Sequence, residues 1–531
     1  MTPRLRAALP DLALALLALA FAWGAARFAW QPGLATLADD SVSYLVMAQV
    51  FSPWQAASGP VAEAFAREAF YPPLFPLLLA LSGAANDVAR AHLVTALLLA
   101  CWLPLFYLLA QRMLGGRWPA LAAALALASL PIVWIHAKGV LSEPLFGALL
   151  LALFLALERA PRGRGGQAMV TALLAALVLT RSAALLAVAA YGLWALAHPG
   201  RSLRQRIGAA WPAAAAVAAY AAWVLLRPAG SGDDYARILA ERGAALAHSS
   251  SILAALGASL ARQALAMAQA WTGSLLIFWV EGSPFRPALA ALVGALAIAG
   301  LAWRFALWKA DAWMSAAYLA TYLAWPFYDQ MTRFLMPLVP VLLLYAFWVF
   351  GEAARRLRRS PSGAQAVLAL VVLSLTLPAA AFLQQRAKAG APLADIVDWY
   401  RTPALDEARR RARVQLDLMA DLADIRRLTQ PHERIMWVAP SYVALLAGRR
   451  GVAAPSAALP PASYRDAVEA AHPDYIFLSV FHPRDTLSDA AWQAGLAALL
   501  GRAEVVQTRV SGEDGKVSSL LLRLPARRAG L

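Results

Sequence analysis

The sequence predicts a multi-pass α-helical membrane protein that ends in a small α/β domain. Of its 531 residues, 61% are hydrophobic, and the mean hydropathy is +0.57, above the usual range for soluble domains. Apolar runs close to the roughly 20 residues that cross a bilayer recur through the first two-thirds of the chain. The remainder has the composition of a soluble domain. We therefore divide the chain into a membrane module, residues 1–385, and a C-terminal domain, residues 386–531.

The first apolar run is interpreted as a retained span rather than a cleaved signal peptide. A basic start, MTPRLR, precedes it, but the run continues to Trp30 without a small-residue cleavage site. With the runs that follow it, we expect about 11 transmembrane helices. The runs are Leu12–Trp30, Ala91–Ala110, Ala120–Ile135, Glu143–Leu157, Gln167–Thr180, Ser182–Ala197, Ala209–Leu226, Ala288–Trp303, Ala312–Phe327, Phe334–Phe350 and Ala366–Phe382.

The net charge of +16 comes from Lys and Arg residues that lie between the apolar runs. A nucleic-acid-binding protein would gather these residues on one soluble face, so the pattern argues against that class. With the N-terminus in the cytoplasm, every basic cluster falls on the cytoplasmic side, as the positive-inside rule requires. The clusters are Arg4 and Arg6, Arg112 and Arg117, Arg159 with Arg162 and Arg164, Arg201 with Arg204 and Arg206, Arg304 with Lys309, and Arg355–Arg359.

Two assignments depend on this rule. Gln167–Thr180 and Ser182–Ala197 meet at Arg181 without a Gly or Pro, yet merging them would move Arg201–Arg206 to the outer side. Counting Leu265–Val280 as a span would likewise export Arg355–Arg359, so we expect an outer-face or re-entrant helix there. The connectors 31–90 and 227–287 and the C-terminal domain then lie outside.

The C-terminal domain alternates predicted strands with predicted helices, which indicates an α/β fold. It opens with a charged stretch, Asp406–Arg427, which we interpret as a solvated helix. The C-terminal domain as a whole either only covers the membrane module or selects an acceptor substrate. The predicted strands are Arg434–Val438, Tyr475–Val480, Ala503–Val510 and Val517–Leu524, and the predicted helices are Ser463–Ala471 and Ser488–Leu500.

Two adjacent carboxylates, Asp39 and Asp40, follow the first span. The apolar residues after them approximate helical spacing, so we expect a short amphipathic helix along the membrane surface. Asp40 or Ser41 would serve as its N-cap. Residue types alone favour this capping role over a catalytic one.

Further polar residues fall at outer turns between spans. Singly, Lys138 and Arg333 could be interfacial anchors, and Glu143 could be a first-turn helix acid. Ionisable groups near a bilayer are costly, however, and tend to face a cavity or a partner. Their convergence on one face predicts a site for an anionic ligand. The residues are His136, Lys138, Ser142, Glu143, Arg181, Tyr328, Asp329 and Arg333.

Taken in order, several short motifs resemble those of the integral-membrane GT-C glycosyltransferases. The organisation is similar to that of protein O-mannosyltransferases and lipid A aminoarabinose transferases, over roughly the first two-thirds of the chain. Their order and common sidedness carry the resemblance. The matching motifs are Asp40 with Tyr44, Tyr71-Pro72-Pro73, Ser142-Glu143-Pro144, Thr180-Arg181 and Arg333-Phe334-Leu335-Met336-Pro337.

The resemblance implies a GT-C type fold and transfer of a sugar from a polyprenyl-phosphate donor to an acceptor, with inversion at the anomeric carbon. Asp40 would be the general base that activates the acceptor. Arg333, with Lys138 and Arg181 as companions, would stabilise the departing phosphate. The remaining residues expected at the substrate site are Asp39, Tyr44, Tyr71, His136, Glu143 and Tyr328.

The sequence departs from the relatives at the first motif, where they often carry Asp-Glu. Here Ser41 follows Asp40, and the second acid, Asp39, precedes it, so Asp39 remains a possible substitute base. The second outer turn, AKG, lacks the acidic pair that holds a divalent metal in oligosaccharyltransferase relatives. We therefore predict no metal site and no cofactor beyond the lipid-linked donor. The single cysteine, Cys101, lies in a span and is interpreted as a packing residue.

Two other classes of protein remain open. A polyprenyl-lipid or glycolipid flippase would also place charges on a lipid-phosphate path, although it would be expected to show related halves. A non-catalytic envelope assembly factor would use the C-terminal domain to bind a partner. In each case we expect an inner-membrane protein with a cytoplasmic N-terminus and a periplasmic C-terminal domain. The expected partners are the lipid bilayer, a polyprenyl-phosphate sugar and an envelope lipid, glycan or protein acceptor.

Overall fold

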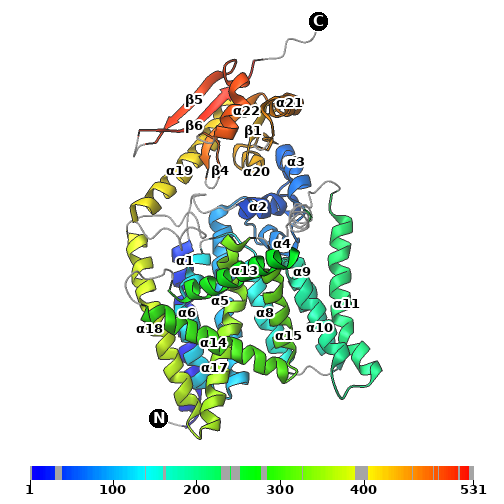
Figure 1. Ribbon diagram of the computed structural model, residues 1–531, viewed down its shortest axis with the longest axis vertical. Helices are drawn as coiled ribbons and strands as arrows, with labels where there is room; N and C mark the ends of the chain where they lie inside the picture. The colour runs from blue at the N-terminus through cyan, green and yellow to red at the C-terminus, as the bar shows by residue number, and fades with distance from the viewer. Residues whose placement is uncertain are drawn as a thin grey trace.

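The computed structural model describes residues 3–29, 39–137, 139–159, 163–228, 240, 251–276, 284–325, 327–388, 405–456, 459–481, 484–487, 490–511 and 515–525. A bundle of long helices forms one end of the molecule and carries the N-terminus, while a β-sheet domain forms the other end and carries the C-terminus (Figure 1). Short helices lie between the two.

Each predicted apolar run overlaps one or more helices of the membrane module. Among the described residues, seven helices are long and apolar enough to cross a membrane. The multi-pass helical fold is confirmed, and the expected number of about 11 spans stays a prediction. The helices are α1 (Pro3–Ala29), α5 (Val88–Leu114), α6 (Arg117–Ser129), α7 (Pro131–His136), α8 (Glu143–Glu158), α9 (Gly163–Thr180), α10 (Ala184–Ala197), α11 (Leu203–Leu226), α14 (Phe285–Ala306), α15 (Ala310–Ala324), α16 (Met331–Leu335), α17 (Val339–Arg356) and α18 (Pro361–Lys388).

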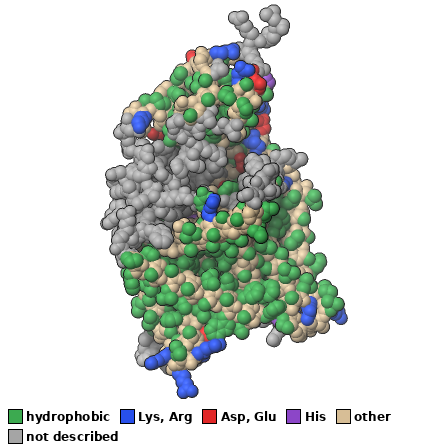
Figure 2. All heavy atoms as spheres, in the orientation of Figure 1, with side chains coloured by type: hydrophobic (Ala, Val, Ile, Leu, Met, Phe, Trp, Pro, Cys, Tyr) green, Lys and Arg blue, Asp and Glu red, His purple; other side chains and the backbone are tan. Residues whose placement is uncertain are grey.

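The surface of the bundle fits a bilayer. Hydrophobic side chains cover most of the visible face of the bundle, and Lys and Arg side chains gather at its lower end (Figure 2). Helix α13 (Ile252–Leu276) is not among the seven apolar helices and crosses the others in Figure 1. This agrees with a non-spanning helix at Leu265–Val280, although residues 277–280 lie outside the described part of the chain. The predicted break at Arg181 is also present, between α9 and α10.

Three short helices connect the bundle to the C-terminal domain: α2 (Asp39–Phe51), α3 (Gly59–Glu68) and α4 (Leu74–Leu81). The expectation of an amphipathic surface helix after the acidic pair was wrong. Every residue of α2 from Ser41 to Ala48 is buried, because α3, α4 and the C-terminal domain pack around it. The helix begins at Asp39, so Asp40 lies in its first turn, and its side chain contacts other elements.

The C-terminal domain contains a mixed sheet with strand order β2-β1-β3-β6-β5, and β4 (Arg484–Asp485) pairs with β3. β1 pairs in parallel with β2 and β3, and β6 pairs antiparallel with β3 and β5. All four predicted strands are present, as β1, β3, β5 and β6, whereas β2 was not predicted. The strands are β1 (Arg434–Trp437), β2 (Arg450–Ala453), β3 (Tyr475–Phe481), β5 (Glu504–Val510) and β6 (Val517–Arg523).

Helices cover the sheet according to the period-two alternation of β3. Ile476 and Leu478 pack with α21 (Pro461–Ala471) and α22 (Ala490–Leu500), the two predicted helices. Tyr475 and Phe477 point to the opposite face and pack with α19 (Leu405–Leu428) and with the segment that contains α20 (Pro440–Tyr442) and η4 (Val443–Ala447).

The interpretation of Asp406–Arg427 as a solvated helix was wrong for its second half. Leu418, Leu422 and Ile425 of α19 are 1–3% exposed, and they belong to one buried cluster with strand residues such as Trp437 and loop-helix residues such as Phe75. The C-terminal domain and helices α2 and α4 therefore share a hydrophobic core.

Candidate active site

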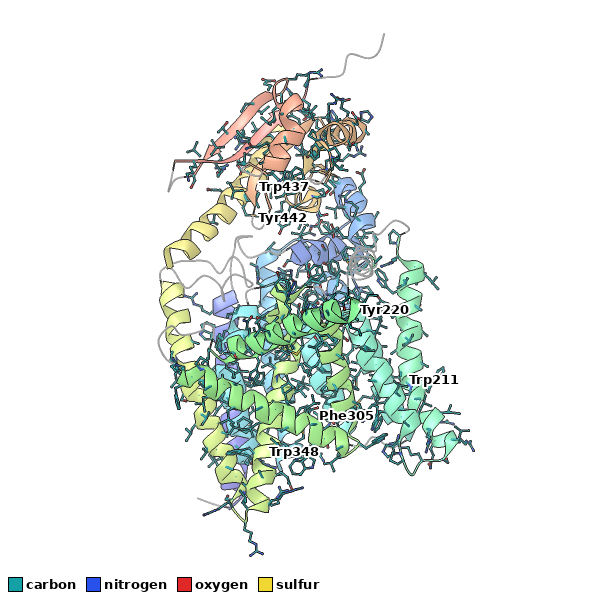
Figure 3. The ribbon with its side chains drawn as sticks, in the orientation of Figure 1. Trp211, Tyr220, Phe305, Trp348, Trp437 and Tyr442 are labelled. Atoms are coloured by element: carbon teal, nitrogen blue, oxygen red, sulfur yellow. The ribbon has the colours of Figure 1, made fainter. Side chains whose placement is uncertain are left out.

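A cavity of about 910 Å³ lies where the membrane module meets the C-terminal domain. Figure 3 labels two of its lining residues, Tyr220 of α11 and Tyr442 of α20, which approach it from these two parts of the molecule. Side chains of α2, α10, α15 and α16 complete much of the wall. The lining combines a few charged side chains with many apolar and aromatic ones, the usual make-up of a ligand-binding pocket.

Asp40 lies on the cavity wall, and both of its carboxylate oxygens have partners. The Tyr71 hydroxyl donates a 2.7 Å hydrogen bond to Oδ1, and Arg333 Nη2 forms an ion pair with Oδ2. The side chain of Asp40 is still 22% exposed. Two oxygens offer about four acceptor positions, so acceptor capacity remains for a ligand hydroxyl.

Behind Asp40, Glu143 holds two arginines together. Its side chain is fully buried at the start of α8, where the helix dipole favours an acid. Oε1 accepts from Arg333 Nε and, at 2.7 Å, from Arg181 Nη1. The four charges of Asp40, Glu143, Arg181 and Arg333 cancel, so this polar cluster is formally neutral.

Tyr44 supports the same cluster from α2. Its hydroxyl lies 2.9 Å from Ser142 Oγ, which also accepts a 3.0 Å hydrogen bond from Arg181 Nη1. Burial, reinforced by the nearby Asp40 carboxylate, raises the pKa of Tyr44 well above its ordinary value. The phenol is therefore neutral, and its hydroxyl links α2 to Ser142 and, through Ser142, to Arg181.

A second polar group lines the cavity nearer the C-terminal domain. Glu68 Oε2 accepts a 2.6 Å hydrogen bond from Ser43, and Oε1 accepts one from Ser441. Arg67 also lines the cavity, and its Nε is buried without a hydrogen-bond partner in the described part of the chain. Glu68, Arg67 and Ser441 were not among the predicted site residues, although an acid three residues before Tyr71 in the first outer loop was a visible signal.

The structure brings most of the predicted site residues together. Asp40, Tyr44, Tyr71, Arg181 and Arg333 all line the cavity, and Glu143 pairs with both arginines. Their roles in binding or catalysis remain predictions.

His136 and Tyr328 do not line the cavity. His136 is fully buried, and its Nδ1 is hydrogen-bonded to the Ile132 carbonyl oxygen at 2.8 Å. Tyr328 is 49% exposed and faces Arg262. Lys138 and the side chains of Asp39 and Asp329 lie outside the part of the chain that the structure describes. Within that part, no group of three or more His, Cys, Asp or Glu residues could hold a metal ion.

Comparisons with known proteins identify the fold. No family model and no curated protein matches this chain, but solved structures do. ArnT from Cupriavidus metallidurans in the apo state has a TM-score of 0.51 and 12% identity, over 96% of this chain and 97% of that chain. The same protein bound to undecaprenyl phosphate gives 0.50 and 12%, over 97% and 98% of the two chains.

An oligosaccharyltransferase from Archaeoglobus fulgidus, tethered with an acceptor peptide, gives a TM-score of 0.49 and 12% identity over 96% of this chain and 74% of that chain. ArnT and this enzyme are GT-C glycosyltransferases. The likeness to ArnT over nearly the whole length of both chains confirms the expected GT-C type fold, with a small C-terminal sheet domain. At these identities the likeness concerns the fold.

Proposed function

We propose that this protein is a glycosyltransferase that moves a sugar from a polyprenyl-phosphate donor to a hydroxyl of a lipid, glycan or protein acceptor. The observation that carries the proposal is the position of Asp40. Its carboxylate lies on the wall of a cavity large enough for a ligand, within one polar cluster that also contains Arg181 and Arg333. A base and cations at one point are what glycosyl transfer from a phosphate requires.

Asp40 acts as the general base. An acceptor hydroxyl is a weak nucleophile, and a positioned carboxylate that takes its proton contributes about 10²–10⁴ in rate. The acceptor oxygen forms a bond to the anomeric carbon as the bond from that carbon to the phosphate oxygen breaks. Asp40 receives the proton, the polyprenyl phosphate leaves with the bonding electrons, and the configuration inverts. Tyr71 and Arg333 hold the carboxylate in place for this step.

Arg181 is the better placed cation for the departing phosphate. Arg333 uses Nε and Nη2 on Glu143 and Asp40, whereas Arg181 uses only Nη1 in the contacts to Glu143 and Ser142. Arg181 lines the cavity, and since Nε is buried, Nη2 is the guanidinium nitrogen left to donate to a ligand there. An unused donor aimed at growing negative charge stabilises the transition state. We therefore assign the main phosphate contact to Arg181 and a positioning role to Arg333.

The apolar part of the cavity suits the lipid tail of the donor. Leu185 and Leu186 of α10 and Phe334 of α16 line it, so the tail would lie along the bundle while the phosphate reaches the arginines. ArnT, which shares the fold, has been solved bound to undecaprenyl phosphate. The donor class proposed for this chain follows from that likeness together with the charge pattern of the cavity.

We further infer that transfer takes place on the outer face of the inner membrane, with the N-terminus in the cytoplasm. The positive-inside rule supports this orientation, because the predicted spans put the Arg-rich connectors on one side of the membrane and the connectors with Asp40, Arg181 and Arg333 on the other.

The test is a transfer assay with purified protein, a panel of polyprenyl-phosphate sugars and extracted envelope lipids and glycans. The wild type should transfer sugar, and Asp40→Asn should lose about 10²–10⁴ in kcat. Normal transfer by Asp40→Asn would remove the assigned base. Failure of the wild type with every donor would reject the function.

A further inference from the structure

Glu68 joins two distant parts of the chain at the cavity wall. Its two carboxylate oxygens accept hydrogen bonds from Ser43 of α2 and from Ser441 of α20, which lie 25 and 373 residues away in sequence. Hydrogen bonds to an ionised carboxylate are stronger than those between neutral groups. All three side chains line the cavity, so this connection forms part of the site itself.

At one end of the connection, Glu68 reaches the helix that carries Asp40. Ser43 lies three residues after Asp40 in α2, and residues with this spacing share one face of a helix. Since both side chains line the cavity, the Ser43–Glu68 hydrogen bond restrains α2 next to the proposed base. A shift of that helix would change the direction of the Asp40 carboxylate.

At the other end, Glu68 accepts a hydrogen bond from the Ala439–Tyr442 turn, which contains the short helix α20. This turn packs closely against the sheet of the C-terminal domain. A Cβ added at Gly451 of β2 would lie 2.0 Å from the Pro440 carbonyl oxygen, so β2 and the turn are in close contact. Tyr442 packs edge-on against Trp437 of β1, with ring centroids 5.9 Å apart, and Figure 3 shows both residues on the side of the domain that faces the bundle. The turn is therefore a rigid part of the cavity wall.

We propose that Glu68 is a positioning residue that fixes the Ala439–Tyr442 turn of the C-terminal domain as the acceptor-facing wall of the cavity, and at the same time fixes the helix of the base. That this wall faces an acceptor rests on the proposed glycosyltransferase function. The mechanical part, a wall held closed through Glu68, does not depend on that function. The lipid-phosphate contacts lie at the Arg181 end, so the connection through Glu68 should affect the acceptor and not the donor.

The chain offers a matched control at the same interface. Arg450 of β2 and Glu63 of α3 form a 2.8 Å ion pair, with side chains 51% and 50% exposed. This pair also joins α3 to the C-terminal domain, but neither residue lines the cavity. Removing it tests the loss of another contact between α3 and the C-terminal domain without changing the wall.

The first experiment measures whether the wall opens. Cys101→Ala provides a cysteine-free background, and Ala183→Cys places a thiol in the cavity wall. Ser441→Ala and Glu68→Ala should each raise the rate of labelling by a water-soluble thiol reagent by about tenfold, the scale of one charge-assisted hydrogen bond. Ser441→Thr, which keeps the hydroxyl, and Glu63→Gln should label at the parent rate. Equal rates in Ser441→Ala and Glu63→Gln would overturn the proposal.

The second experiment separates the two ends of the connection in the transfer assay, with extracted envelope lipids as the acceptor pool. Ser441→Ala should raise the apparent KM for the pool about tenfold, Ser43→Ala should lower kcat about tenfold, and Glu68→Ala should do both. Binding of undecaprenyl phosphate should stay within about twofold of wild type in all three, which also reports on folding. Loss of that binding in Ser441→Ala would refute the assigned role, whereas absence of transfer by the wild type would count against the function alone.

Discussion

Arg181 and Glu143 form an ion pair, with 2.7 Å between Nη1 and Oε1, that joins the turn after α9 to the first residue of α8. The Glu143 side chain is fully buried, and the Arg181 side chain is 12% exposed. Glu143 also pairs with Arg333. The single carboxylate of Glu143 in α8 is therefore paired with guanidinium groups from two other elements, Arg181 in the turn after α9 and Arg333 in α16.

Glu143→Ala should destabilise the protein strongly, because two buried cations would lose their common counter-charge. Removing one partner of a buried pair costs about 3–5 kcal/mol, which thermal unfolding in detergent would measure. Glu63→Gln breaks the exposed pair with Arg450 and should cost less than about 1 kcal/mol. A similar small loss in both variants would show that Arg181 and Arg333 are hydrated in solution.

Arg181→Gln should weaken binding of undecaprenyl phosphate by about 10- to 100-fold, the range expected for one hydrogen bond to a charged group. The reason is that Arg181 lines the cavity and uses only Nη1 in its contacts to Glu143 and Ser142. Binding can be measured by ligand-dependent thermal stabilisation. Arg262→Gln, which alters an exposed arginine over Tyr328, serves as the control. Equal affinities in the two variants would remove Arg181 from the phosphate site.

Tyr71→Phe should lower kcat about tenfold while leaving undecaprenyl phosphate affinity unchanged. The substitution removes the 2.7 Å hydrogen bond to Asp40 but keeps the aromatic ring that packs against Tyr44, with centroids 5.1 Å apart. Steady-state kinetics with saturating donor would measure the change. An unchanged kcat would mean that Arg333 alone is sufficient to orient the carboxylate.

Asp311→Ala should reduce stability without reducing transfer per folded molecule. Asp311 accepts from Arg304 Nε and Nη2 at 2.8 and 2.9 Å and from the Tyr345 hydroxyl at 2.7 Å, and none of the three residues lines the cavity. The expected loss is about 3–5 kcal/mol by thermal unfolding. A selective loss of kcat in protein that is fully folded would contradict the separation of this buried group from the site.

Single cysteines at Ser58 and Ser362, in a Cys101→Ala background, should react with a membrane-impermeant reagent from opposite sides of the membrane. Both positions are exposed, and the positive-inside rule places the first outside and the second inside. Labelling of intact and permeabilised cells measures the sidedness. Reaction of both cysteines from one side would disprove the proposed orientation.

Much of the fold could be predicted because local patterns carry it. A short, nearly continuous apolar run predicted the strand Tyr475–Val480, which is β3, and longer apolar runs predicted the helices of the bundle. The predictions for α2 and for the second half of α19 were wrong because the burial of these helices depends on tertiary contacts. In α19, the apolar spacing of Leu418, Leu422 and Ile425 was a visible sign of a buried face, but the charged residues around them outweighed it.

The candidate site could be predicted only in part, because its contacts link residues that are far apart in the chain. Sidedness placed Asp40 and Arg333 on one face, but their ion pair spans 293 residues and has no local signature. Glu68 was missed for the same reason, since its partner Ser441 belongs to a different domain. Tyr328 was predicted from its place at an outer turn beside Arg333, yet its side chain is exposed and does not line the cavity.

One buried core contains Phe75 and Leu79 of α4 together with Trp437 and Phe477 of the sheet. The boundary of the cooperatively folded unit therefore differs from the boundary that composition indicates. The change to soluble composition near residue 385 suggests an appendage that could be removed. The buried cluster instead makes the sheet domain and the loop helices α2 and α4 one unit of unfolding. A truncated protein that ends before α19 would expose the apolar surface of α2 and α4 to water, so the helix that carries Asp40 would lose its order first.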